Sequence, residues 1–212
     1  MTTPENSLAD DFCARPVAES RTVYTGIVWD VARDTVDFAP GVRFTRDYVA
    51  HTGAVAILAL TPERDVVVIR QYRHPARAHM WELPAGLLDK AGEDPAVAAV
   101  RELEEETGYT AGAVHHLLDY YPSAGGSNER ISVYVAFDCT EAKGVDFERV
   151  DEEAEILTRT VPLDELEDAA LSGRLHNSAL IIATLAYTAR VRRGEAPGTF
   201  NCASARTSAE IR

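Results

Sequence analysis

The sequence predicts an α/β (α+β) fold in which helices sandwich a mixed sheet, with a small antiparallel β-sheet appended on its N-terminal side. Two apolar runs, 53–60 and 65–72, are separated by the turn-forming segment Thr61-Pro62-Glu63-Arg64, as is typical of strands in one central sheet. The first run is apolar on both faces, which indicates layers on either side. β-like stretches come first and helices come last, an order that fits such a sandwich.

The residues ahead of these runs are predicted to form the small separate sheet. Residues 1–18 look like a flexible leader, and residues 19–50 hold β-like stretches with a turn at Ala39-Pro40-Gly41. These stretches are 22–31, 33–38 and 42–49. A sheet of this size cannot enclose a core, so it must pack on the rest of the chain or on a second copy of the protein.

Residues 51–194 are predicted to form the main domain, and residues 195–212 a loosely held tail with little apolar periodicity. One helix has clear boundaries, with Asp94 as its N-cap, Pro95 at its first position and Gly108 just past its end. The further predicted elements are strands at 131–137 and 156–161 and helices at about 163–172 and 177–192.

Charge and cysteine content restrict the partners of the protein. The net charge is 21 − 34 = −13, and a surface this acidic repels nucleic acids and anionic lipids, so we expect neither as a partner. A phosphorylated substrate would need a cation to bridge it to the protein. Cys13, Cys139 and Cys202 have no metal-binding or disulfide spacing, and the chain shows no signal-peptide pattern, so we expect a cytoplasmic protein.

Acidic side chains gather near the end of the predicted helix 94–107. Glu105 and Glu106 follow Glu102 by three and four positions, so the three carboxylates can converge. The face opposite them, predicted to pack on the sheet, is the stripe Ala96, Val100, Leu103 and Thr107. Like charges at this spacing oppose helix formation, and glutamates in a last turn face the wrong end of the helix dipole. This conflict indicates a counter-ion.

Mg²⁺ or Mn²⁺ is the counter-ion that such a set of hard oxygen ligands suits, with substrate phosphate oxygens completing the coordination. A divalent cation would also bridge the acidic protein to an anionic substrate. The alternative is a solvated, glutamate-rich helix face, which is how most charge runs are used. The pattern around the glutamates favours the metal.

That pattern resembles the signature of the Nudix family: Gly, five residues, Glu, seven residues, then Arg-Glu-apolar-x-Glu-Glu-x-Gly-apolar. Here Glu93 is followed by seven residues and by Arg101-Glu102-Leu103-Glu104-Glu105-Glu106-Thr107-Gly108-Tyr109, a full match. One departure exists, since six residues rather than five separate Gly86 from Glu93. The extra residue falls in a loop, where it is tolerable.

The resemblance extends outside this motif to the ADP-ribose pyrophosphatase branch of the family. The matching segments are Gln71-Tyr72-Arg73, Trp81-Glu82-Leu83-Pro84-Ala85-Gly86, Ser123 to Arg130 and Asn177-Ser178, so the likeness covers roughly residues 20–190. It implies the Nudix α/β/α sandwich, Mg²⁺-dependent cleavage of a nucleoside diphosphate sugar such as ADP-ribose, and a homodimer whose N-terminal strands exchange contacts.

The resemblance also implies roles for individual residues. Its metal ligands are Glu102 and Glu106, with Glu105 in support and the carbonyl oxygen of Ala85 as a further donor. Arg101 would orient the carboxylates through charge-assisted hydrogen bonds. Glu93 would brace the loop that begins at Gly86.

A general base must lie near the attacking water, and in this branch it is a glutamate on a loop in the C-terminal third. Within 151–155, Glu153 is the first choice and Glu152 the second, with Glu105 a further catalytic candidate; the alternative for the run is a solvated acidic loop. The candidate substrate contacts are Arg73, Glu82 and Glu129. Arg73 would bind phosphate, although Arg73 and Glu129 could equally form ordinary surface ion pairs.

Two alternatives stay open. The branch usually has a proline some fifteen residues beyond the motif, whereas this chain has Ala124 and Gly125 there and Pro122 displaced, which leaves other nucleoside diphosphate derivatives possible. A non-catalytic Nudix-like metabolite sensor is the other alternative, but such domains tend to lose the motif carboxylates that this chain keeps. For base stacking, Trp29 and Tyr72 are candidates, or they are simply packed.

Overall fold

The computed structural model describes residues 8–142 and 155–196. The chain divides into two compact units. The first comprises residues 1–51 with 123–128, and the second comprises 52–122 with 129–212. We describe each unit by itself.

The second unit contains a seven-stranded mixed sheet, as the sequence predicted, with the strand order β12-β5-β4-β10-β9; β6 pairs with β5 and β7 with β4. The pair β4–β10 is parallel and the other pairs are antiparallel. The strands are β4 (Ala54–Leu60), β5 (Asp65–Arg73), β6 (Ala78–Glu82), β7 (Ala85–Leu87), β9 (Ala113–Tyr120), β10 (Ile131–Phe137) and β12 (Leu157–Pro162). Two smaller features are a 3₁₀ turn (His74–Ala76) and the two-stranded pair of β8 (Tyr109–Thr110) and β11 (Thr140–Glu141).

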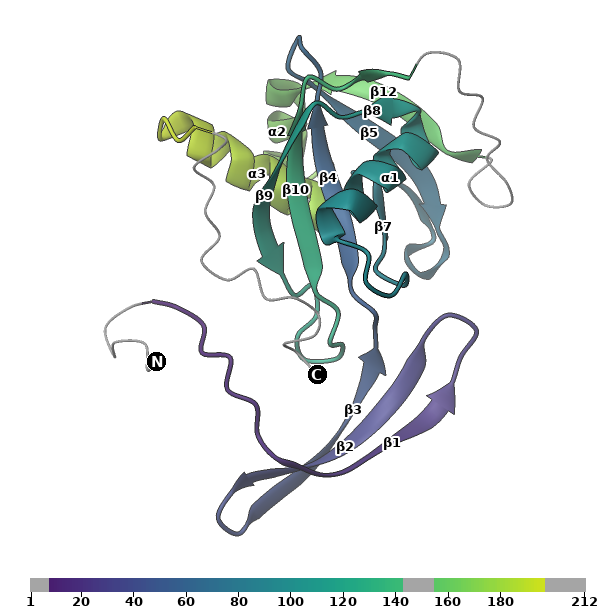
Figure 1. The fold of residues 1–212 in the computed structure, drawn as a ribbon, viewed down its shortest axis with the longest axis vertical. Helices are drawn as coiled ribbons and strands as arrows, with labels where there is room; N and C mark the ends of the chain where they lie inside the picture. Colours follow the sequence, from purple (N-terminus) through teal and green to yellow (C-terminus); the bar gives the residue numbers. More distant parts are fainter. Residues whose placement is uncertain (1–7, 143–154, 197–212) are drawn as a thin grey trace. The chain divides into compact units, whose positions relative to one another are not determined.

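Strand β4 is buried along its whole length because it has a helical layer on each face. Its alternate side chains enter two separate apolar clusters, since successive residues of a strand point to opposite faces. Val55 and Ile57 pack with Leu103 of α1 (Pro95–Thr107), whereas Leu58 packs with Leu180 of α3 (Ser178–Arg192). Helix α2 (Leu163–Leu171) covers the same face as α3 (Figure 1). The predicted α/β/α sandwich is confirmed.

Helix α1 begins and ends where the sequence indicated. The Asp94 side chain accepts a hydrogen bond from the Ala96 N–H at 2.8 Å, and Gly108 ends the helix with a φ of 74°, in the left-handed region that glycine adopts without strain. The packing face differs in part from the predicted stripe. Leu103 and Thr107 are buried and Val100 packs half-buried on the same cluster, as predicted, but the face also includes the buried Ala98, Ala99 and Glu106 and does not bury Ala96. The small alanines allow close approach to the sheet, and this rotation turns Glu106 inwards.

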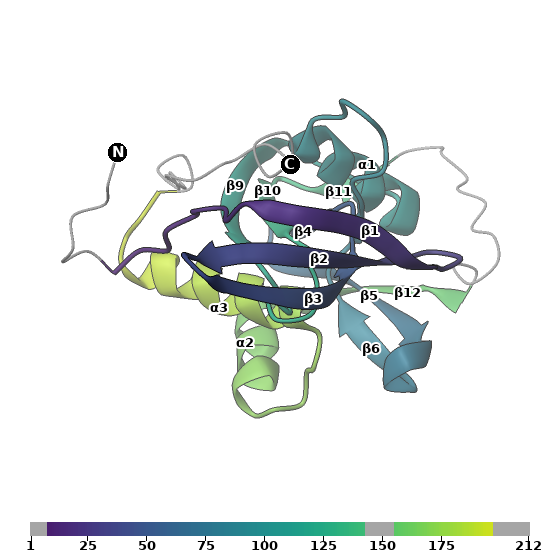
Figure 2. The same cartoon turned by 90° about the horizontal axis from the view of Figure 1, so that it is seen from below.

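The first unit contains an antiparallel meander of β1 (Val17–Thr25), β2 (Asp30–Ala39) and β3 (Val42–Ala50), with β2 in the middle (Figure 2). The first strand begins and ends earlier than predicted because the chain turns at 26–29, where the Gly26 N–H donates to the Trp29 carbonyl at 3.1 Å. A Cβ at Gly26 would lie 2.2 Å from that carbonyl oxygen, so the turn requires glycine.

Several short elements were not predicted from the sequence. β6 and β7 lie within residues 78–87, where a proline and small residues give no strand signal, and β9 carries two adjacent histidines that interrupt its alternation. Within 8–142 and 155–196, no helix combines the length and apolarity needed to span a membrane.

Removing the N-cap side chain of α1 is expected to destabilise the fold modestly. Asp94→Ala leaves the Ala96 N–H without its acceptor and should lower the free energy of unfolding by about 1 kcal/mol. Urea denaturation monitored by circular dichroism measures this loss. Glu63→Ala, which removes an exposed carboxylate from the turn between β4 and β5, is the control for charge. Equal stability of both variants would contradict the capping role.

Candidate functional site

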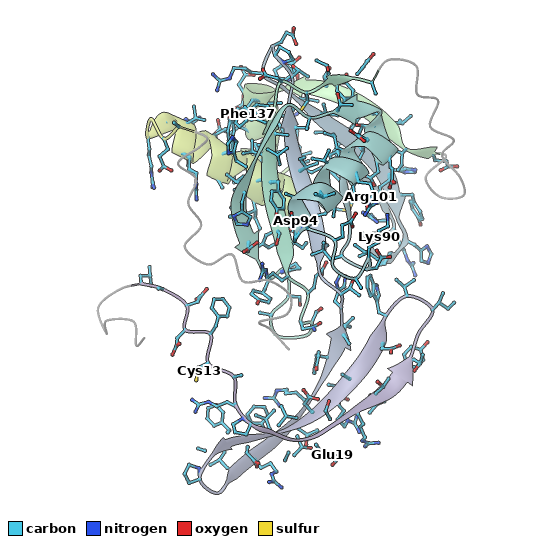
Figure 3. The ribbon with its side chains drawn as sticks, viewed as in Figure 1. Cys13, Glu19, Lys90, Asp94, Arg101 and Phe137 are labelled. Carbon is cyan, nitrogen blue, oxygen red and sulfur yellow. The ribbon has the colours of Figure 1, made fainter. Side chains whose placement is uncertain are left out.

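Arg101 on α1 lies among three of the carboxylates that the sequence singled out. Its guanidinium donates to Glu93 at 3.0 and 3.1 Å, to Glu102 at 2.6 Å and to Glu105 at 2.8 Å. Figure 3 shows Arg101 on the helix, with Lys90 in the loop that precedes it. The Arg101 guanidinium therefore joins the loop, the helix and the predicted cluster.

Strand β7 comes exceptionally close to this cluster. A Cβ placed on Gly86 would lie 2.1 Å from the carboxyl carbon of Glu102 and 2.2 Å from its Oε1. No side chain fits there, so the glycine that starts the motif is required for the backbone to touch the carboxylate. This contact holds β7 against the middle of α1.

Glu106, one turn further along, points to the same segment. Its side chain is buried, and its Oε2 accepts a hydrogen bond from the Ala85 N–H at 2.9 Å. Glu102 and Glu106 therefore both contact the Ala85-Gly86 backbone, one by close packing and one by a hydrogen bond. Of the predicted metal ligands, the structure brings Glu102 and Glu106 to the Ala85 segment, whereas Glu105 is joined to Glu102 through Arg101.

The electrostatic setting of the cluster follows from burial and from Arg101. Burial raises the pKa of Glu102, and the Arg101 hydrogen bond only partly offsets this effect. The hydrogen bond from Arg101 lowers the pKa of Glu93, and the guanidinium pKa of Arg101 is raised in return. Glu102 is thus a carboxylate whose negative charge is poorly solvated, and a second cation beside it would favour its ionised form.

The donor set suits a hard divalent cation. Carboxylate oxygens and a backbone carbonyl are the ligands that Mg²⁺ and Mn²⁺ prefer, and the Gly86 contact leaves no side chain between Glu102 and the backbone. Among the residues that the structure describes, no three acidic, histidine or cysteine side chains already form a metal-holding group. Arg101 bonds to Oε1 of Glu102 and to Oε2 of Glu105, so each carboxylate has a second oxygen to offer a cation. The residues therefore offer the oxygen ligands that Mg²⁺ or Mn²⁺ requires.

Two of the predicted substrate contacts form a pair. Arg73, at the end of β5, donates from Nε and Nη2 to the two carboxylate oxygens of Glu82 on β6, at 2.9 and 2.7 Å. The Glu82 side chain is only 3% exposed, whereas that of Arg73 is 47% exposed. The structure thus directs the Glu82 carboxylate at Arg73.

The remaining candidates lie elsewhere. Glu129 is half-buried, and its charge contributes to raising the pKa of Tyr120, for which burial is the main cause. Trp29 stacks on His51 in the first unit, with ring centroids 4.0 Å apart, and Tyr72 lies tilted against His79. Glu152 and Glu153 lie outside the described residues.

A polar network on β9 and β10 was missed at the level of sequence. The His116 side chain is only 17% exposed, and its Nε2 lies 2.9 Å from Asp119. Arg130 lies 3.4 Å from the other oxygen of Asp119. The hydrogen bond from His116 and the charge of Arg130 help to hold the Asp119 pKa below its usual value against the opposing effect of burial, the largest single influence. Recognising 113–120 as a strand would have placed His116 on an inward face.

The chain is similar to known proteins over most of its length. The NUDIX domain family matches residues 50–181. An ADP-ribose pyrophosphatase of Mycobacterium tuberculosis is 38% identical over 170 residues, which are 80% of this chain and 81% of that protein. A methanol dehydrogenase activator of Bacillus methanolicus is 36% identical over 165 residues, 78% of this chain and 88% of that protein.

A solved structure supports the same fold. The crystal structure of an ADP compounds hydrolase superposes with a TM-score of 0.71 at 20% identity, covering 88% of this chain and 98% of that one. The matched domain, the motif from Glu93 to Tyr109 and the similar proteins all indicate the same family. This chain belongs to the Nudix hydrolase family.

A side chain at position 86 is expected to weaken metal binding. Gly86→Ala would push the Glu102 carboxylate from its place and should lower the affinity for Mn²⁺ by about 10–100-fold, the range seen when groups that orient a metal ligand are displaced. Isothermal titration calorimetry measures this change. Gly125→Ala is the matched control, since a Cβ there meets no atom within 4 Å. Unchanged Mn²⁺ affinity in Gly86→Ala would argue against a site at this contact.

Proposed function

We propose that this protein hydrolyses the pyrophosphate bond of a nucleoside diphosphate sugar, with ADP-ribose giving AMP and ribose 5-phosphate, in a reaction that depends on Mg²⁺ or Mn²⁺. The observation that carries the proposal is the contact of both Glu102 and Glu106 with the Ala85-Gly86 backbone, while Glu105 shares the Arg101 guanidinium with Glu102. The similarity to an ADP-ribose pyrophosphatase over 81% of its length supports the choice of substrate.

Glu102 and Glu106 would hold the metal as primary ligands, with Glu105 in support and the carbonyl oxygen of Ala85 as a backbone donor. Arg101 and Glu93 orient these carboxylates through the hydrogen bonds described above. When bound, the divalent cation neutralises charge on the diphosphate oxygens and makes water easier to deprotonate.

The reaction adds the oxygen of water to one phosphorus and breaks the bond from that phosphorus to the bridging oxygen. The bridging oxygen leaves with the other phosphate. A carboxylate must accept the proton of the attacking water, and we assign this role to Glu153, with Glu152 as the next choice and Glu105 as a further candidate. We assign Arg73 to the diphosphate and Glu129 to a second substrate contact.

We further propose a cytoplasmic homodimer without nucleic acid or membrane partners. The first unit supports this, because its three-stranded sheet exposes apolar side chains that a second copy would cover, among them Tyr24, Val28, Phe38 and Val42. In this proposal residues 19–50 form the dimer contact and residues 51–194 the catalytic domain.

A different nucleoside diphosphate sugar is the second candidate for the substrate. Ala124 and Gly125 stand where the ADP-ribose branch usually has a proline, so the contacts that select the sugar differ here. This departure affects the choice of substrate and not the chemistry at the metal.

A panel of diphosphate compounds tests the reaction and its substrate together. With Mg²⁺, we expect ADP-ribose to be converted to AMP and ribose 5-phosphate faster than a GDP-linked sugar or a dinucleoside polyphosphate, as measured by chromatography of the products. Excess chelator should abolish turnover and added Mg²⁺ should restore it, because the acidic site needs a bridging cation. Tight binding of ADP-ribose without cleavage would instead identify a sensor.

The negative charge of Glu106 is expected to be essential for turnover. Glu106→Gln keeps an oxygen that can accept the Ala85 N–H but removes a metal ligand's charge, so turnover should fall by roughly 100-fold or more. Steady-state kinetics and thermal melting separate this effect from loss of fold. Glu104→Gln on the same helix is the matched control and should keep normal turnover. Near-normal turnover of Glu106→Gln would refute the assignment.

A further inference from the structure

We propose that Glu82 is a positioning residue, whose buried carboxylate fixes the guanidinium of Arg73 in the orientation that binds the diphosphate. This inference rests on the proposed function, which supplies the diphosphate. It replaces the expectation that Glu82 itself contacts the substrate.

The geometry of the pair is that of a fixed clamp. Two roughly parallel hydrogen bonds of 2.9 and 2.7 Å join the guanidinium to both carboxylate oxygens, the arrangement that specifies orientation as well as attraction. The hairpin register pairs Arg73 with Ala78 and Glu82 with Ile69, so the Arg73 side chain reaches back along the hairpin. Gln71 Nε2 lies 3.5 Å from a Glu82 oxygen on the same face.

The pair lies on the face of the sheet that carries α1. Val67 packs in the apolar cluster that contains Leu103 of α1, and alternate residues of a strand share a face, so Arg73 points to that side. Tyr72 points to the other face. Glu82 is separated by only Leu83 and Pro84 from Ala85, whose N–H binds Glu106. Arg73 is therefore held on the face of the sheet that α1 and its carboxylates cover.

Burial makes the two partners unequal. The Glu82 carboxylate is almost fully withdrawn from water, and an unpaired charge there would be costly, so it must keep a cationic partner. The Arg73 side chain is about half-exposed and can meet a ligand while Glu82 holds it. An arginine held in this way binds without losing further rotational freedom, so the effect of the pair should appear in substrate affinity.

Kinetics of ADP-ribose hydrolysis at saturating Mg²⁺ test the proposal. Glu82→Gln should raise KM by about tenfold with little change in kcat, because a charged hydrogen-bonding contact made equally in the bound and transition states is weakened. Arg73→Ala should raise KM at least as much. In the double variant, Glu82→Gln should add almost nothing to Arg73→Ala, since it acts through that side chain.

Binding of ADP in the presence of a chelator gives a second readout that needs neither metal nor turnover. Calorimetry should show weaker ADP binding for Glu82→Gln and for Arg73→Ala, and no further loss in the double variant. If the wild-type protein cleaved no nucleoside diphosphate, the proposed function would fail, while this titration would still decide the role of Glu82.

A matched control exists in the other layer. Glu167 on α2 is also a buried carboxylate, paired with the exposed Arg192 at 2.5 Å. Glu167→Gln should lower thermal stability but leave KM unchanged. If Glu82→Gln behaves in the same way, or raises KM equally with and without Arg73, Glu82 is a structural residue and the proposal is overturned.

Should Glu82→Gln not fold, Glu82→Asp keeps the charge but shortens the clamp and should give the same KM pattern. Failure of both variants to fold would also overturn the proposal.

Discussion

The contact between the Ala85-Gly86 backbone and the glutamates of α1 is the constraint on which the rest of the site depends. Gly86 admits the Glu102 carboxylate where no Cβ fits, and Ala85 gives its N–H to Glu106. The sheet holds β7 in place through its pairing with β4, which is buried on both faces. Core packing therefore fixes the distance between the helix carboxylates and the backbone donor, and no flexible loop sets it.

Arg101 has a complementary part in this arrangement. Three carboxylates near the end of one helix repel each other, and Arg101 offsets this repulsion by bonding to Glu102 and Glu105 while Glu93 holds it from the preceding loop. A divalent cation would share Glu102 and Glu105 with Arg101, since each carboxylate has a second oxygen. Because Arg101 also donates two hydrogen bonds to Glu93, its guanidinium stays anchored beside these carboxylates.

Those parts of the fold and site that depend on local chemistry could be predicted from the sequence. The ends of α1 follow from Asp94, Pro95 and Gly108, and the central strands follow from two apolar runs. The converging glutamates follow from helical spacing. Features that depend on register or on how a helix is rotated could not be predicted. The Arg73–Glu82 clamp requires the hairpin pairing of β5 and β6, and the inward turn of Glu106 depends on which alanines of α1 meet the sheet.

Strand β4 changes partners midway. Its last residues pair with β5 and its first residues pair with β7, while the Ile57 N–H donates to the Pro84 carbonyl between them. The chain at 84–86 is thus wedged into a split in the sheet, and what it offers to the helix is peptide backbone. A donor of this kind is indifferent to the identity of its own side chain. Another small residue at position 85 would present the same backbone groups to the helix. A substitution that disturbs β4 or β5 would instead displace the 84–86 backbone and disable the site from a distance.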